Sequence, residues 1–181
     1  MCDSFQCWQA IHLAAATCQE ECLKSLLEAG ANVDALDFNY STPLHCAAAA
    51  GCQRCAKVLL DHGADSNALN GRYDDKWSPL HYACCWGHAD IVKILLNHGV
   101  DCNKQNREGW TPLHTAAANG HVECALLLLE AGARLDLQDN EGLDVWGRAV
   151  WTGDAEVLSR LSVSGYFSGK HTLHKQSERT D

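Results

Sequence analysis

Two sets of residues in this 181-residue chain have side chains that could bind metal ions or transfer protons. His12, His45, His81 and His114 recur at separations of 33, 36 and 33 residues, so they could form a metal-binding or acid–base array. The eleven cysteines include one CxxC sequence, Cys52-Gln53-Arg54-Cys55, a spacing found in zinc and redox sites. Either kind of site needs further ligands or reactive partners close by.

Those partners are scarce in the sequence. A zinc ribbon would require a second CxxC, and only Cys84-Cys85 and the two histidines of His171-Thr172-Leu173-His174 offer other ligands. The sequence also has no GxSxG, phosphate-binding loop, dinucleotide-binding or HExxH motif. We therefore predict no metal, no cofactor and no enzymatic activity.

The elements that would position these residues form one repeated unit, clearest between residues 110 and 142. Thr111-Pro112 suits the start of a short helix, and Gly120 suits its end. A second helix with a continuous apolar run follows over residues 122–129 and stops before Gly132. The polar residues 139–142 are typical of a hairpin tip. The pattern predicts two short helices and a hairpin, stacked on neighbours of the same kind.

The repeated motifs resemble the ankyrin repeat. They are TPLH at 42–45, SPLH at 78–81 and TPLH at 111–114, the glycines Gly51, Gly87 and Gly120, and the endings EAGANVD, DHGADSN, NHGVDCN and EAGARLD. The resemblance covers nearly all of residues 8–163. It implies an all-α fold, an ankyrin-repeat solenoid of stacked helix-turn-helix units with hairpin fingers on one side. It also implies that the four histidines form hydrogen bonds within the repeat and bind no metal.

We predict one ankyrin repeat domain over residues 1–163, followed by a flexible polar tail over residues 164–181. The units span residues 5–36, 37–69, 70–105, 106–138 and 139–163, with the first and last as caps. Cys18 stands where later units have glycine, so we expect that helix to end differently from the others.

Cysteine positions and the absence of export signals predict a reduced protein in the cytoplasm, the nucleus or both. Cys22, Cys55 and Cys124 share a second-helix position with Ile91, where a small buried apolar group is expected. The sequence has no signal peptide or run of apolar residues long enough to cross a bilayer. We therefore expect free thiols that serve as packing groups.

The formal net charge of -9 disfavours nucleic acid and anionic membranes as partners, because both attract basic surfaces. We expect a monomer that binds another protein, whose contact surface would be basic.

The resemblance implies that a partner is bound by the fingertips and by the exposed edges of the first helices. Trp, Tyr and Arg residues often dominate interface energies, at roughly 2 kcal/mol or more each when central. The predicted partner-binding residues are Phe38, Tyr40, Arg72, Tyr73, Trp77, Trp86, Arg107, Trp110, Asn119 and Trp151. Trp110 could equally pack on the neighbouring finger, whereas binding is favoured for Trp86 and Tyr73.

These features predict a non-enzymatic adaptor, and two alternatives stay open. The repeats are similar to those of SOCS-box ankyrin proteins, which would suggest a substrate-recognition subunit of a ubiquitin ligase. No such box is visible after Gly165, which counts against this alternative unless the chain is a fragment or short isoform. A compact inhibitor of a kinase or transcription factor is the second alternative.

Asn67 and Asn103 are candidates for modification. Each lies eight residues after a leucine, Leu59 or Leu95, and follows GADS or GVDC. They resemble ankyrin asparagines that are hydroxylated by the oxygen-sensing asparagine hydroxylase.

Overall fold

A computed structural model describes residues 4–71, 76–152 and 159–160 of the chain. Among these residues all of the regular secondary structure is helical. The helices are α1 (Ser4–Ala16), α2 (Glu20–Glu28), α3 (Pro43–Ala50), α4 (Gln53–Asp61), α5 (Pro79–Cys85), α6 (Ala89–Asn97), α7 (Pro112–Ala118), α8 (Val122–Glu130) and α9 (Val145–Thr152). This confirms the predicted all-helical solenoid.

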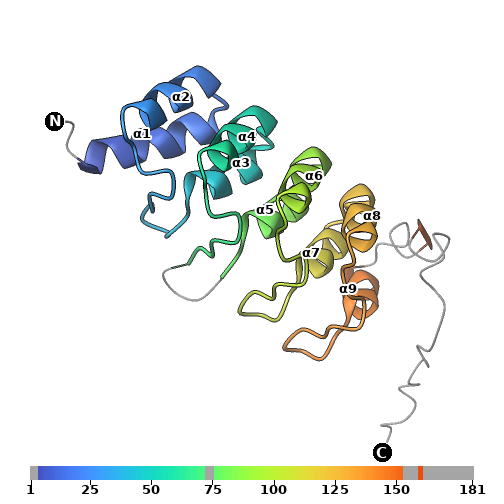
Figure 1. Cartoon of the computed structure of the whole chain (residues 1–181). Coiled ribbons are helices and arrows are strands. Elements are labelled where there is room, and N and C mark those ends of the chain that lie inside the picture. Colours follow the sequence, from blue (N-terminus) through green and yellow to red (C-terminus); the bar gives the residue numbers. More distant parts are fainter. Residues whose placement is uncertain (1–3, 72–75, 153–158, 161–181) are drawn as a thin grey trace, which may run out of the picture.

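The helices are stacked in two rows. Helices α1, α3, α5, α7 and α9 each contact the next member of that row, and α2, α4, α6 and α8 do the same in the second row. Consecutive helices pair across the rows, so each unit contributes one helix to each row. The loops between units all project to the same side as the first row (Figure 1). The members of the predicted binding set that the structure describes belong to the first-row helices and to these fingers.

The starts of the first-row helices α3, α5 and α7 follow from the Thr/Ser-Pro-Leu-His motif. Thr42, Ser78 and Thr111 are N-caps, and a proline follows each cap at the start of its helix. The histidine at the third helical position completes each capping box, because its Nδ1 accepts a hydrogen bond from the backbone N–H of the cap residue. Helix α9 has no such motif, and Asp144 Oδ1 instead accepts the Gly147 N–H at 2.8 Å.

Each finger is closed at its base by one Asp or Asn residue. Asp37, Asn70, Asn106 and Asp139 donate their backbone N–H to the carbonyl of the residue that ends the finger. Their side-chain oxygens also accept the N–H of that same residue. The closure is made by turns, and the described residues form no strand. The finger from Asn70 to Trp77 closes in this way despite its three extra residues.

The core runs through both rows. Leu44, Leu80 and Leu113 in the first row and Leu59, Leu95 and Leu128 in the second are inaccessible to solvent. Small residues between them let the helices approach closely. Cys55 and Cys124 are buried as predicted, but the prediction for Cys22 is wrong, because this residue is exposed. Cys22 belongs to the first unit, and no other unit in the described part of the chain packs on its outer side.

The four histidines of the motif join successive units. Nε2 of His12, His45 and His81 lies 2.9–3.0 Å from the backbone carbonyl oxygen of Ser41, Trp77 and Trp110, respectively. His114 makes the same contact with Leu143 at 3.4 Å. In His45, His81 and His114 the Nδ1 lone pair is already used by the cap N–H, so Nε2 carries the hydrogen and donates it. Each of these rings therefore has to be neutral, with no nitrogen left to bind a metal.

Two expectations for the cysteines are wrong. Cys18 and Cys52 form a disulfide between the first two units, so these two side chains are not free thiols. The helix end at Cys18 also does not differ from the others, because Cys18 has a φ of 60° and Gly51 has a φ of 69°. Cys18 thus adopts the left-handed backbone conformation that glycine has at the equivalent place in later units.

The predicted second helix of the fifth unit and the predicted tail at 164–181 lie outside the described residues, apart from Ser159 and Arg160.

Lowering the pH from 6.5 towards 4 should destabilise the fold. Burial lowers the pKa of His45 and of His81 to about 4, even though their backbone hydrogen bonds favour the charged ring. In the unfolded chain each ring takes up a proton near its ordinary pKa of 6.5. The stabilisation is therefore complete above pH 6.5 and falls as the pH approaches 4, by roughly 3 kcal/mol per histidine. Urea unfolding at a series of pH values measures it.

His81→Gln should reduce this pH dependence, with His98→Gln as the control for losing an exposed histidine. An unchanged slope of unfolding free energy against pH in the His81 variant would contradict the assignment.

Candidate protein-binding surface

The side chain of Trp77 is half-buried and packs against neighbouring rings. Its ring centroid lies 5.5 Å from that of Tyr82 and 5.9 Å from that of His81. Asn70 fixes this group, because its Nδ2 donates to Tyr82 Oη at 2.8 Å and its Oδ1 accepts the Trp77 N–H at 2.9 Å. The ring of Trp77 therefore contributes to packing between helix α5 and the finger that runs from Asn70 to Trp77.

Trp110 occupies the equivalent place one unit later and packs against a charged group. The guanidinium carbon of Arg148 lies 4.6 Å from the Trp110 ring centroid, within the range of a cation–π contact. Arg148 is only 6% exposed and pairs with Asp139 and, at 3.1 Å, with Glu141. Burial opposes ionisation of Asp139, but the hydrogen bonds from Arg148 and from two backbone N–H groups outweigh it and lower the pKa of this carboxyl.

Sequence reasoning missed Arg148. The available signal is Asp139, a carboxylate where the third and fourth units have the neutral Asn70 and Asn106. A buried carboxylate at a finger base calls for a cation nearby.

The finger between the first and second units exposes a group of apolar side chains. Phe38 is 73% exposed and Tyr40 is 43% exposed, and Leu36, which the sequence analysis did not select, is also exposed. Tyr40 has a φ of 60°, a left-handed conformation at the fingertip where a glycine would be usual. We call Leu36, Phe38 and Tyr40 the apolar fingertip. Their alternation with Asp37 and Asn39 is the sequence signal for it.

Trp86 lies on the first row of helices, at the C-cap of α5, and is 61% exposed. Among the described residues its side chain makes no hydrogen bond or ring contact. Asn119 is the equivalent C-cap of α7, and its Nδ2 donates to the Thr115 carbonyl at 2.8 Å, so it caps its own helix. Trp151 belongs to α9.

Of the remaining predicted residues, the structure describes only Arg107. Arg72 and Tyr73 lie outside the described residues. Arg107 is exposed, and its carbonyl accepts a hydrogen bond from Asn140 Nδ2 at 2.7 Å, which joins two fingers. The predicted aromatic residues therefore differ in exposure. Trp77 and Trp110 each pack on a neighbouring side chain, whereas Phe38, Tyr40 and Trp86 are exposed.

A family model described as ankyrin repeats (3 copies) matches residues 1–70 and 67–139. The chain belongs to the ankyrin-repeat family. A search of curated proteins found no match. Ankyrin repeats generally act as protein–protein interaction modules and are typically non-enzymatic.

Several thiols of this ankyrin-repeat chain are poorly suited to chemistry. Burial raises the pKa of Cys84 far above its usual value and raises the pKa of Cys124 to about 11. Burial also raises the pKa of Cys85. A protonated, buried thiol is a weak nucleophile and a weak metal ligand. The three sulfurs that do converge are those of Cys18, Cys52 and Cys55, which lie within 4.8 Å of one another.

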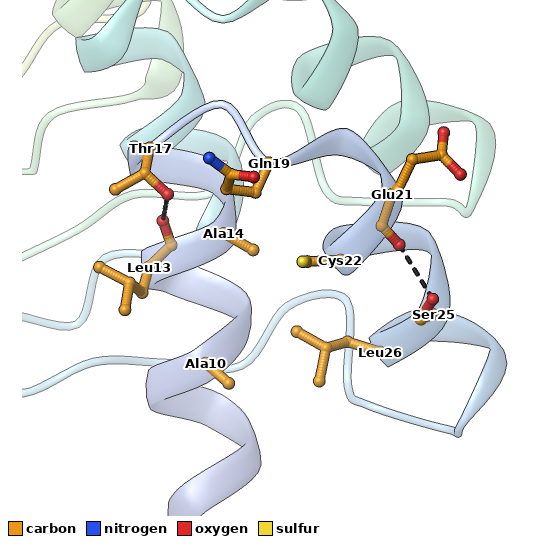
Figure 2. Close-up of a pocket in the computed structure, with 9 residues that line it drawn as sticks. All are labelled: Ala10, Leu13, Ala14, Thr17, Gln19, Glu21, Cys22, Ser25 and Leu26. Carbon is orange, nitrogen blue, oxygen red and sulfur yellow. Dashed lines mark hydrogen bonds between the residues drawn. The ribbon is translucent and has the colours of Figure 1, made fainter.

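An apolar pocket lies at the outer side of the first ankyrin unit (Figure 2). Its polar groups bond within their own helices: Thr17 Oγ1 donates to the Leu13 carbonyl, and Ser25 Oγ donates to the Glu21 carbonyl. The lining residues are Ala10, Leu13, Ala14, Thr17, Gln19, Glu21, Cys22, Ser25 and Leu26. In the later units the equivalent side packs against the preceding unit, whereas in the first unit it carries this pocket. The Thr17 and Ser25 hydroxyls of the pocket are therefore already bonded to backbone carbonyls of the same unit.

Ion pairs on the second row of helices lie away from the candidate surface. Lys24 pairs with Glu20 at 2.8 Å, and Lys93 pairs with Glu123 at 3.4 Å. These side chains are largely solvated, and such pairs contribute little to stability. In the described parts of the chain, no helix has the length and apolar character needed to cross a membrane.

Trp86, which is exposed, and Trp110, which packs against Arg148, should respond differently to truncation. Trp110→Ala should lower the free energy of unfolding by about 2 kcal/mol, because it removes a half-buried ring and the contact with Arg148. Trp86→Ala should change it by less than about 0.5 kcal/mol. Urea unfolding of both variants measures the difference, and similar losses in both would assign Trp86 to the core.

Proposed function

We propose that this chain is a non-enzymatic adaptor that binds another protein through the apolar fingertip and Trp86. The observation that carries the proposal is the exposure of Leu36, Phe38 and Tyr40 on one finger and of Trp86 at the C-cap of the first-row helix α5. Large apolar and aromatic side chains exposed together on a soluble fold commonly mark interaction sites. Their rings have few rotatable bonds, so ordering them on binding costs little conformational entropy.

The rigidity of the stack supports this use. Backbone hydrogen bonds and an Asp or Asn side chain close each described finger, and the histidines fix each finger to the preceding helix. A surface held in one conformation loses little entropy when a partner binds. Trp77 and Trp110 stabilise this frame, and their half-exposed edges extend the proposed surface.

The partner is a protein with an apolar patch surrounded by basic groups. The net charge of -9 favours a basic partner and disfavours nucleic acid or an anionic membrane. We further propose that the chain acts as a monomer in the cytoplasm or nucleus. Ubiquitin-ligase components among the bound proteins would support a substrate-recognition role, and a kinase or transcription factor would support an inhibitory one.

The test is capture of partners from cell extract, followed by affinity measurement with the purified partner. Phe38→Ala and Trp86→Ala should each weaken binding about tenfold or more, without lowering the melting temperature. Leu13→Ala is the matched control, because Leu13 is 63% exposed but lines the pocket at the end of the stack. Equal affinity for all three variants, or a loss only with Leu13→Ala, would contradict the proposed surface.

We also propose hydroxylation of Asn67 and Asn103. The Oδ1 atoms of these residues accept the backbone N–H of Asp101 and Arg134 in the following units, at 3.2 and 2.8 Å. A hydroxyl on the adjacent carbon would leave both hydrogen bonds available. Peptide mass analysis of protein from human-type cells should show an addition of about 16 Da, because hydroxylation inserts one oxygen atom into a C–H bond. Unmodified peptides at both positions would remove this proposal.

A further inference from the structure

The same contact holds the ends of the first-row helices α3 and α5 to the units that follow them. Gly51 and Gly87 end α3 and α5 with φ values of 69° and 72°, and His88 and His121 of the following units lie against them. A Cβ atom on Gly51 would lie 2.7 Å from the His88 ring, and one on Gly87 would lie 2.6 Å from the His121 ring. The rings therefore occupy the space that a side chain would need.

These histidines also satisfy the helix ends. His88 Nε2 donates to the Ala49 carbonyl at 3.1 Å, and His121 Nε2 donates to the Cys85 carbonyl at 3.0 Å. The carbonyl groups at the end of a helix lack partners within the helix, so such a bond stabilises the junction. Glycine in one unit and histidine in the next thus work as a pair.

Both members of this pair are cysteines between the first and second units. Cys18 has the position and the left-handed conformation of the glycine, and Cys52 has the position of the histidine. Cys18 and Cys52 are 34 residues apart, with a Cα–Cα distance of 5.5 Å that suits a disulfide. A covalent bond replaces the hydrogen bond at this junction alone among the three that the structure describes.

A third thiol adjoins the disulfide. Cys55 is inaccessible to solvent, and its Sγ lies within 4.8 Å of both other sulfurs. Cys52 is the N-cap of α4 and Cys55 is its third residue, so the two form a CxxC sequence at a helix start. Burial and the nearby Glu20 raise the pKa of Cys55, with Arg54 opposing them, so this thiol is mostly protonated and must lose its proton before it can attack a disulfide. Cys18 is exposed and offers access from solvent.

We propose that Cys18, Cys52 and Cys55 form a thiol–disulfide exchange site that takes low-molecular-weight disulfides of the glutathione type as oxidant. In the reduced protein the Cys18 thiolate attacks the small disulfide, forms a mixed disulfide and releases one small thiolate. The Cys52 thiolate then attacks Cys18 Sγ, closes the Cys18–Cys52 bond and releases the second small thiolate. Two protein thiols are oxidised and one small disulfide is reduced to two thiols.

Cys55 provides the second step of the site. After losing its proton, Cys55 attacks Cys52 Sγ, so that the Cys52–Cys55 bond forms and the Cys18–Cys52 bond breaks. Cys18 leaves as a thiolate and takes up a proton, so the exchange needs no further oxidant. The first unit is covalently attached to the second in one form and detached in the other.

The test uses the full chain in glutathione redox buffers, with acid quenching, alkylation and peptide mapping. Oxidised protein should contain both Cys18–Cys52 and Cys52–Cys55 linked peptides, and alkylation of Cys52, which takes part in both bonds, should fall about tenfold or more. Cys55→Ser should show only the Cys18–Cys52 link. Cys18→Gly, which restores the usual residue for this backbone conformation and removes the exposed thiol that attacks the small disulfide, should show neither link. Cys22→Ser, which removes an exposed thiol outside the group, should match the wild type.

Three results would overturn the proposal. The first is Cys18 and Cys52 alkylated as fully as Cys22 in oxidising buffer. The second is a stable glutathione adduct on Cys18 with neither linked peptide. The third is a stoichiometric zinc ion in protein purified under reducing conditions that protects all three thiols, which would make the group a metal site. A higher urea midpoint on oxidation of the wild type, absent in Cys18→Gly, would show the attachment of the first unit directly.

Discussion

The structure depends on hydrogen bonds that run from the side chains of one unit to the backbone of the next. A single unit has two short helices, too few to bury an apolar face or to satisfy its helix ends. His45 and His81 supply both needs, because each ring closes a capping box in its own helix and holds the base of the following finger. Stability, finger geometry and pH response thus share one cause at these two junctions, the need for a neutral buried imidazole.

The same frame separates residues that support the fold from residues that are available for binding. At Trp77 and Trp110 the backbone carbonyl belongs to the histidine contact and the ring packs on a neighbour. Phe38 and Trp86 are exposed and lie on the same frame. An interaction surface of this kind can be rigid without being built from core residues.

The sequence predicted the helices well, because they follow from local motifs that repeat at nearly constant spacing. It predicted that the histidines form hydrogen bonds inside the repeat, but not that they also bond to the next unit. It could not predict features that depend on contacts between different positions of neighbouring units. The Cys18–Cys52 disulfide requires the end of α1 to lie beside the start of α4 in the following unit. An alignment of equivalent positions does not show that these two different positions meet. Cys22 was misjudged because its column assumes a neighbour on both sides. Arg148 was missed because its partner, Asp139, lies across a turn.

One detail of the histidine contact affects how such a molecule can diversify. The acceptor is a main-chain oxygen, so any amino acid that ends the finger can provide it. The loop from Asn70 to Trp77 illustrates this freedom, since its greater length leaves the contact with His45 in place. Mutation and insertion at the tips can therefore create new recognition surfaces while the register of the stack is inherited unchanged.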